Sequence, residues 1–246
     1  MSNFRHAPAL LCALLVSFNT AWAKQPAPAA PGTAAVTAIA QNKNTQAAIT
    51  PAIALKMLKD GNARFTSGRM MKRNLVKQVK ATGSGQYPFA FVVSCIDSRA
   101  APELVFDQGI GDIFSARIAG NFVNDDIIGS IEYGARVAGA KLVVVLGHSD
   151  CGAIKGTCDG VQLGHLTGAL AKIKPALDAV PDDGSPRDSK NYAFVQKVAD
   201  MNVRLAVQEI RDRSPVLREM ADKGEIAIVG AMLDVKTGKV AFYDKN

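Results

Sequence analysis

The sequence predicts an α/β fold: a mostly parallel β-sheet of about four strands plus an antiparallel edge strand, flanked by helices, with an N-terminal helical arm. Short runs rich in Val, Ile and Phe alternate with longer segments of helical spacing, as in chains that form parallel sheets. Two of these runs, 89–93 and 141–146, are apolar at almost every position, which is typical of strands buried on both faces. Near the C-terminus, Thr237-Gly238 joins two short strand-like runs and indicates the antiparallel edge.

The first 48 residues are expected to lie outside the folded domain. An apolar run at 9–18 follows Arg5 and precedes an Ala-Trp-Ala sequence, the pattern of a secretory signal peptide cleaved after Ala23. This run is too short to span a bilayer, so no membrane insertion is expected after cleavage. Residues 24–48 are rich in Ala and Pro without an apolar period, and they predict a flexible linker. The domain then covers 49–246 of an exported protein, with the periplasm favoured over full secretion.

Local signals place the elements of this domain in order. Thr50-Pro51 combines an N-cap residue with a proline in the first turn, which predicts a helix start. The basic segment 70–81 is expected as a surface helix or arm. The predicted strands are 88–94, 112–118, 141–146, 225–232 and 240–243. The predicted helices are 51–66, 101–106, one from Asn124 or Asp125 to 138, one opening at Gly152, 163–180, 193–211 and a short one from Ser214-Pro215.

Charge and cysteine content narrow the class of protein. The chain carries 29 Lys and Arg against 22 Asp and Glu, with only 6% aromatic residues. Its basic residues are spread through helices rather than interleaved with aromatics, so no nucleic-acid groove is predicted. After signal removal the cysteines are Cys95, Cys151 and Cys158. Because a disulfide framework needs an even number, metal ligation by two of them is favoured over a bridge, with Cys158 as an inert packed thiol.

Two motifs carry the expected chemistry. Cys95-Ile96-Asp97-Ser98-Arg99 follows one apolar run, and His148-Ser149-Asp150-Cys151-Gly152 follows another. In open α/β sheets, sites form at the carboxyl ends of such strands. Two thiols and one imidazole that meet there form a catalytic zinc set, in which the fourth position stays open.

This pair of motifs, some fifty residues apart, resembles the β-class carbonic anhydrases, and the chain looks like an exported bacterial-type member. The resemblance implies one Zn²⁺ per subunit bound by Cys95, His148 and Cys151, beside a catalytic dyad of Asp97 and Arg99. It implies reversible hydration of carbon dioxide to bicarbonate and a proton by attack of zinc-bound hydroxide. It also implies a homodimer or a dimer of dimers. In some members the aspartate becomes a fourth zinc ligand in a closed state, so Asp97 is a possible ligand here.

The resemblance further implies a substrate pocket at the subunit interface. Gln86 matches the pocket glutamine of the family, and Phe114 and Tyr133 match its apolar and phenolic lining residues. Gly152 matches the glycine whose backbone amide faces the substrate. Ordinary packing or turn roles remain open for these side chains. A packing role is favoured over proton relay for His165.

Other functions remain open at this point. One is a hydrolase of a carbon dioxide analogue, CS₂ or COS, on the same scaffold. Another is a non-catalytic zinc-binding envelope protein, in which Asp97 would close the zinc site or form only a solvated ion pair with Arg99. A thiol–disulfide carrier is disfavoured because the chain lacks the Cys-x-x-Cys spacing.

Overall fold

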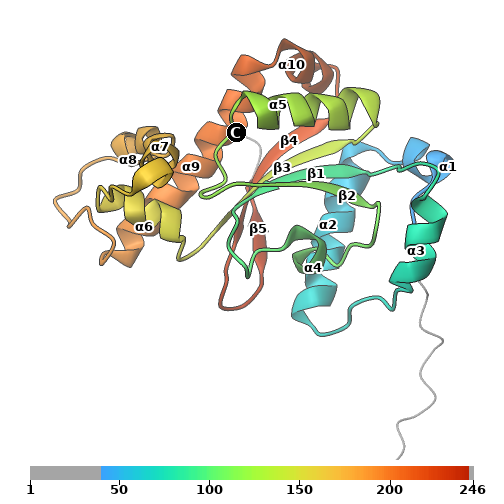
Figure 1. The fold of residues 1–246 in the computed structure, drawn as a ribbon, viewed down its shortest axis with the longest axis horizontal. Coiled ribbons are helices and arrows are strands. Elements are labelled where there is room, and N and C mark those ends of the chain that lie inside the picture. The colour runs from blue at the N-terminus through green and yellow to red at the C-terminus, as the bar shows by residue number, and fades with distance from the viewer. Residues whose placement is uncertain (1–39, 244–246) are drawn as a thin grey trace, which may run out of the picture. The chain divides into compact units, whose positions relative to one another are not determined.

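The computed structural model describes residues 40–243, which form a five-stranded sheet with helices on both faces (Figure 1). The strand order is β2-β1-β3-β4-β5. The strands are β1 (Ala90–Ser94), β2 (Ile113–Arg117), β3 (Leu142–His148), β4 (Ala227–Leu233) and β5 (Val240–Phe242). The first four run parallel, and β5 pairs antiparallel with β4. The predicted fold class is confirmed.

The helices of the described residues follow the chain around this sheet. They are α1 (Lys43–Ala47), α2 (Pro51–Thr66), α3 (Leu75–Thr82), α4 (Pro102–Val105), α5 (Asp125–Glu132), the π-helix η1 (Tyr133–Val137), α6 (Gly152–Cys158), α7 (Gly164–Ala171), α8 (Lys174–Ala179), α9 (Tyr192–Arg213) and α10 (Pro215–Asp222). Thr50 caps α2 through its side chain and Pro51 occupies the first turn, as predicted. Within the described part of the chain, no helix is both long and apolar enough to cross a bilayer.

The two faces of the sheet build separate parts of the core. Alternate residues of a strand point to opposite faces, so Phe91 and Val93 pack with α5, α9 and α10, whereas Ala90 and Val92 pack with α2 and α4. A third apolar cluster joins α6, α7 and α8 to the first half of α9, and it includes Cys95. All of β1 and β3 is buried, as the apolar runs predicted. The two metal-ligand motifs therefore directly follow strands that are buried along their whole length.

Three predicted boundaries need correction. The expected linker extends too far, because part of it forms α1, where Gln46 donates to the carbonyls of Pro88 (2.7 Å) and Ala138 (2.8 Å). The expected helix 163–180 is two helices, since Pro175 lacks the N–H that a continuous helix needs and its ring clashes with the preceding turn. The helix that Asn124 caps changes to a π-helix before residue 138. The predicted signal peptide lies outside the described residues.

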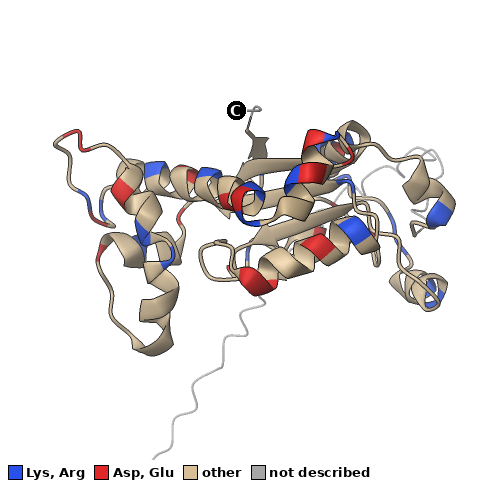
Figure 2. Cartoon of the chain, turned by 90° about the horizontal axis from the view of Figure 1, so that it is seen from above, with Lys and Arg blue, Asp and Glu red and all other residues tan. Residues whose placement is uncertain are grey.

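Charged side chains of both signs are distributed over the helices. Figure 2 shows Lys and Arg interspersed with Asp and Glu on the helices visible from that side. Four ion pairs of the described residues join positions i and i+4 along a single helix, such as Lys56 with Asp60 and Lys174 with Asp178. Such exposed pairs contribute little to stability, about 0.3–0.5 kcal/mol each.

Candidate metal centre

Strand register brings the two motifs together. β1 and β3 are parallel neighbours, and Ser94 lies opposite Leu146. Cys95 therefore leaves the sheet at the same edge as His148, the last residue of β3. Cys151 follows in a short loop and is the N-cap residue of α6. Asp150, between the ligands, adopts a left-handed conformation (φ 58°), and this turns the chain so that both His148 and Cys151 face the cluster.

Cys95, His148 and Cys151 form a buried donor cluster. Their ligand atoms all lie within 4.8 Å of one another, and the two sulfurs are 4.0 Å apart. Two sulfurs at about 2.3 Å from a tetrahedral zinc ion would be roughly 3.8 Å apart, so the observed spacing fits zinc with little adjustment. The cluster was predicted from the sequence, and the structure assembles it as predicted.

The imidazole of His148 is oriented for metal binding. Its Nδ1 atom lies 2.9 Å from the carbonyl oxygen of Ser149, an arrangement that places the proton on Nδ1 and leaves Nε2 as the acceptor nitrogen. This Nε2 atom is buried and has no hydrogen-bond partner. A buried acceptor without a partner is costly, and a cation held between Nε2 and the two sulfurs would remove that cost.

The two cysteines shift each other's pKa in opposite directions. The hydrogen bond from Cys151 lowers the pKa of the Cys95 thiol to about 4, against the opposing effect of burial. The pKa of Cys151 is raised by that same hydrogen bond and by burial. Burial opposes protonation of His148, but its contacts with Cys95 raise its pKa overall. Because a metal binds the thiolate form of cysteine, binding of a divalent cation here would release protons from the sulfurs.

Asp97 is held by Arg99 at the edge of this cluster. The Nε atom and the backbone amide of Arg99 donate to Oδ1 (3.0 and 2.9 Å), and Nη2 donates to Oδ2 (2.8 Å). These hydrogen bonds hold the pKa of Asp97 well below its usual range. Asp97 Oδ2 lies 4.0 Å from His148 Nε2, so the carboxylate borders the position that a metal would occupy. In this structure the carboxylate is paired with Arg99, and not inserted among the three ligands.

Two further residues of the site were missed by sequence reasoning. Arg117, at the end of β2, donates to the carbonyl oxygens of Cys95 (3.0 Å) and Asp97 (2.6 Å), and so fixes the loop that carries a ligand and the dyad. The backbone amide of Gly120 donates to Cys95 Sγ at 3.3 Å. A correct prediction of strand order could have indicated that Arg117 lies near Cys95, because β2 ends beside β1. The contact of Gly120 is made by a backbone amide, which no residue type in the sequence reveals.

The predicted pocket residues lie in different places. Gly152 begins α6 directly after Cys151, beside the cluster, and faces open space. Phe114 and Tyr133 lie together, with their rings 6.3 Å apart, in an open groove beside β2. Gln86 is exposed in the loop before β1. Within one chain the structure thus groups Gly152 with the metal ligands, and it groups Phe114 with Tyr133 in a separate groove. His165 is exposed on α7, and Cys158 is half-buried against the apolar cluster of α6–α9.

An open, mostly parallel sheet that carries a Cys-His-Cys donor set and an arginine-held carboxylate at its carboxyl edge defines an α/β protein with a candidate metal centre. The comparisons narrow this class. A sequence profile described as carbonic anhydrase matches residues 90–240. Carbonic anhydrase 2 of Mycobacterium tuberculosis is 34% identical over 200 residues, which cover 79% of this chain and 93% of the relative. A carbonic anhydrase of Mycolicibacterium smegmatis is 33% identical over 192 residues, covering 77% and 92%.

A solved structure gives the same result. One of two tetrameric β-carbonic anhydrases from Sordaria macrospora matches with a TM-score of 0.57 and 25% identity, covering 66% of this chain and 84% of that one. The chain belongs to the carbonic anhydrase family, and within it to the β-class.

Proposed function

We propose that this protein is an exported, zinc-dependent carbonic anhydrase that interconverts carbon dioxide and bicarbonate. The observation that carries the proposal is the buried Cys95-His148-Cys151 cluster with Asp97 at its border, held by Arg99. A zinc-storage protein needs the three ligands but no oriented carboxylate. The arginine-held Asp97 therefore favours a catalytic site over a storage site.

Cys95, His148 and Cys151 would hold the zinc ion. When bound, zinc lowers the pKa of a coordinated water molecule, to about 7 in the most favourable sites. Two thiolates neutralise the formal charge of the ion, so the effect should be weaker here than with three neutral imidazoles. We therefore expect activity to rise towards alkaline pH, and a flat turnover profile from about pH 6.5 to about pH 9 would contradict this expectation.

Asp97 and Arg99 orient the reactants. Arg99 occupies one side of the carboxylate with its fork of donors. The remaining lone pairs of Asp97 are free to accept a hydrogen bond from the attacking water molecule and to direct its oxygen towards the carbon of carbon dioxide. Because Arg99 keeps the pKa of Asp97 low, the carboxylate stays an acceptor throughout the neutral range.

A second copy of the chain would complete the pocket. β2 is one of the two edge strands of the sheet. Tyr133 lines the groove beside β2 and is 52% exposed. A partner subunit that covers this groove would supply an apolar wall to the pocket, which suits a substrate with few polar groups. This is the interfacial pocket expected for Gln86, Phe114 and Tyr133. A relative in Sordaria macrospora is tetrameric. We infer a dimer or a dimer of dimers, which sedimentation equilibrium of the purified protein would test.

The proposal that the protein is exported rests on the sequence alone. The apolar run and the Ala-Trp-Ala site before Lys24 support a cleaved signal peptide and a periplasmic location. N-terminal sequencing of the protein from a cell-envelope fraction should begin at Lys24. Protein that keeps Met1 and remains in the cytosolic fraction would contradict this part of the proposal.

Metal analysis and a stopped-flow assay test the central proposal together. The purified protein should contain one zinc ion per chain and hydrate carbon dioxide, and chelation should abolish both properties. Carbon disulfide and carbonyl sulfide serve as parallel substrates, because faster turnover of either would identify an analogue hydrolase instead. Stoichiometric zinc with no turnover of any of the three gases would indicate a non-catalytic zinc protein.

A further inference from the structure

Asn202 lies on α9, far in sequence from every metal ligand, but it contacts the shell around the cluster. Its side chain is buried, and Nδ2 donates to the carbonyl oxygen of Gly120 at 2.7 Å. Gly120 in turn donates its backbone amide to Cys95 Sγ at 3.3 Å. A continuous path of two hydrogen bonds thus joins α9 to one of the expected zinc ligands.

The turn that carries Gly120 needs such support. Gly120 has a φ of 80° and its neighbour Asn121 a φ of 44°, so two successive residues are left-handed. A Cβ atom at position 120 would lie 2.4 Å from Ile173 Cδ1, so another residue type would have to displace the end of that buried side chain. Left-handed non-glycine residues persist only where the surrounding structure holds them, at a cost of about 1–3 kcal/mol each. Asn202 supplies one of the contacts that hold this turn.

We propose that Asn202 is a positioning residue of the metal centre, which acts through Gly120 to keep a hydrogen bond on the Cys95 sulfur. This inference rests on the proposed zinc function, because it assigns Cys95 as a ligand. Without Asn202, the buried carbonyl of Gly120 would lose its donor, and the peptide would turn to find another. The amide on the other side of Gly120 would then no longer be aimed at the sulfur.

The hydrogen bond has two effects on a bound metal. It fixes the direction of the sulfur lone pairs, and it withdraws electron density from the thiolate, so Cys95 donates less charge to the ion. The second effect opposes the weakening of Lewis acidity that two thiolates cause. Loss of a supporting contact of this kind typically lowers metal affinity about 10- to 100-fold.

The test uses the full chain loaded with Co²⁺, whose sulfur-to-metal charge-transfer band reports directly on the thiolates. Asn202→Leu and Asn202→Asp both keep the side-chain volume, and each removes the amide that donates to Gly120; having two variants guards against one failing to fold. The matched control is Asn62→Leu. Asn62 is another buried asparagine that bridges backbone carbonyls, those of Val105 (3.0 Å) and Gly238 (2.8 Å).

The Asn202 variants should shift the charge-transfer band to longer wavelength and lower zinc affinity about 10- to 100-fold in a chelator competition. Asn62→Leu should lose at least as much resistance to urea without changing the band or the affinity. The inference is overturned if the Asn202 variants keep the band and affinity of the unaltered protein, or if Asn62→Leu changes them equally. An unaltered protein that shows no sulfur-to-cobalt band would overturn the proposed zinc function itself, so the two failures are distinguishable.

Discussion

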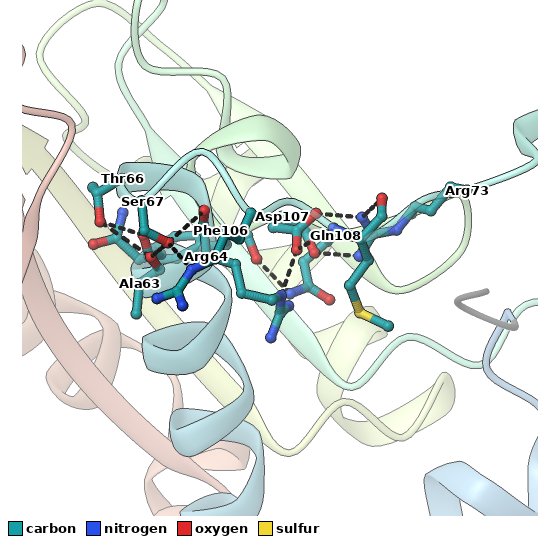
Figure 3. Close-up of polar contacts among 12 residues, drawn as sticks. Ala63, Arg64, Thr66, Ser67, Arg73, Phe106, Asp107 and Gln108 are labelled. Carbon is teal, nitrogen blue, oxygen red and sulfur yellow. Dashed lines mark hydrogen bonds and ion pairs between the residues drawn. The ribbon is translucent and has the colours of Figure 1, made fainter. Parts of the chain in front are cut away.

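Two buried polar clusters of this molecule differ in how far the chain satisfies their acceptor atoms. The first is the metal-ligand cluster, Cys95, His148 and Cys151, in which the buried Nε2 atom of His148 has no partner. The second, the arm cluster, consists of Arg64, Arg73 and Asp107 (Figure 3). There the two guanidinium groups approach the Asp107 carboxylate from two directions, and both of its oxygens accept hydrogen bonds.

The contrast distinguishes the arm cluster, which stabilises the fold, from the metal-ligand cluster, which is proposed to bind a cation. Asp107 is fully buried and left-handed (φ 47°), and Arg64 Nε lies 2.5 Å from its Oδ2. Arg73, from the segment between α2 and α3, donates to both the carboxylate and the backbone carbonyl of Asp107. The arm cluster thus ties the N-terminal arm to the loop after α4 using only groups of the chain. In the metal-ligand cluster, by contrast, no group of the chain pairs with the acceptor nitrogen of His148, which suits the proposed role as a ligand.

The largest effect is expected from breaking the metal-ligand cluster. His148→Gln keeps a side chain of similar bulk but removes the imidazole nitrogen, so zinc should fall from one per chain to a trace after dialysis, with carbon dioxide hydration lost. Unfolding in urea, compared with the unaltered protein after chelation, should change far less than the zinc content, because Nε2 has no partner in the fold and only the hydrogen bond of Nδ1 with Ser149 is lost. A variant that keeps stoichiometric zinc would show that His148 is not a ligand.

The reverse pattern is expected from the arm cluster. Asp107→Asn suits the left-handed backbone but leaves two guanidinium groups without their counter-charge, which should cost about 3–5 kcal/mol of unfolding free energy. Zinc content and turnover of the folded protein should not change. Asp183→Asn is the control: it breaks an exposed ion pair with Lys197 and should change the unfolding free energy far less. Equal losses in the two variants would mean that burial of the arm cluster adds nothing.

Sequence reasoning predicted the sites whose signals lie next to one another in the chain. The ligand motifs and the Thr50-Pro51 helix start each occupy a few consecutive positions. The structure brings Cys95, His148 and Cys151 together and confirms the helix start. Pro175 also indicated a break in the helix predicted at 163–180. The helical spacing of Leu166, Leu170, Ile173 and Leu177 on both sides of it favoured one long helix instead. Asn202 and Arg117 act on backbone atoms of distant segments, and no spacing rule connects them to Cys95. Such contacts appear only when the sheet order is known.

Arg99 combines features of the two clusters. It pairs with the Asp97 carboxylate, as the arginines of the arm cluster pair with Asp107, and it thereby keeps Asp97 out of the metal-ligand cluster. Arg99→Ala should free the carboxylate to approach the metal position and lower turnover by about 100-fold. Zinc content should remain at one per chain. Arg136→Ala, which removes an exposed arginine 4.0 Å from Glu219, should leave turnover unchanged. Normal turnover in Arg99→Ala would exclude the proposed dyad.

The smallest effect concerns Tyr243, which directly follows β5 and pairs with a side chain of α9. Tyr243 donates to Asp200 at 2.5 Å, and burial together with this hydrogen bond raises the pKa of the phenol. Since the unfolded phenol titrates near pH 10, the contribution of Tyr243 to stability is complete below that pH and is lost as pH rises towards the folded pKa. Tyr243→Phe should cost about 1.5 kcal/mol at pH 8, and the difference from the unaltered protein should shrink above about pH 10. Urea midpoints at pH 8 and above about pH 10 measure this difference, and a constant difference would show that the folded phenol does not have a raised pKa.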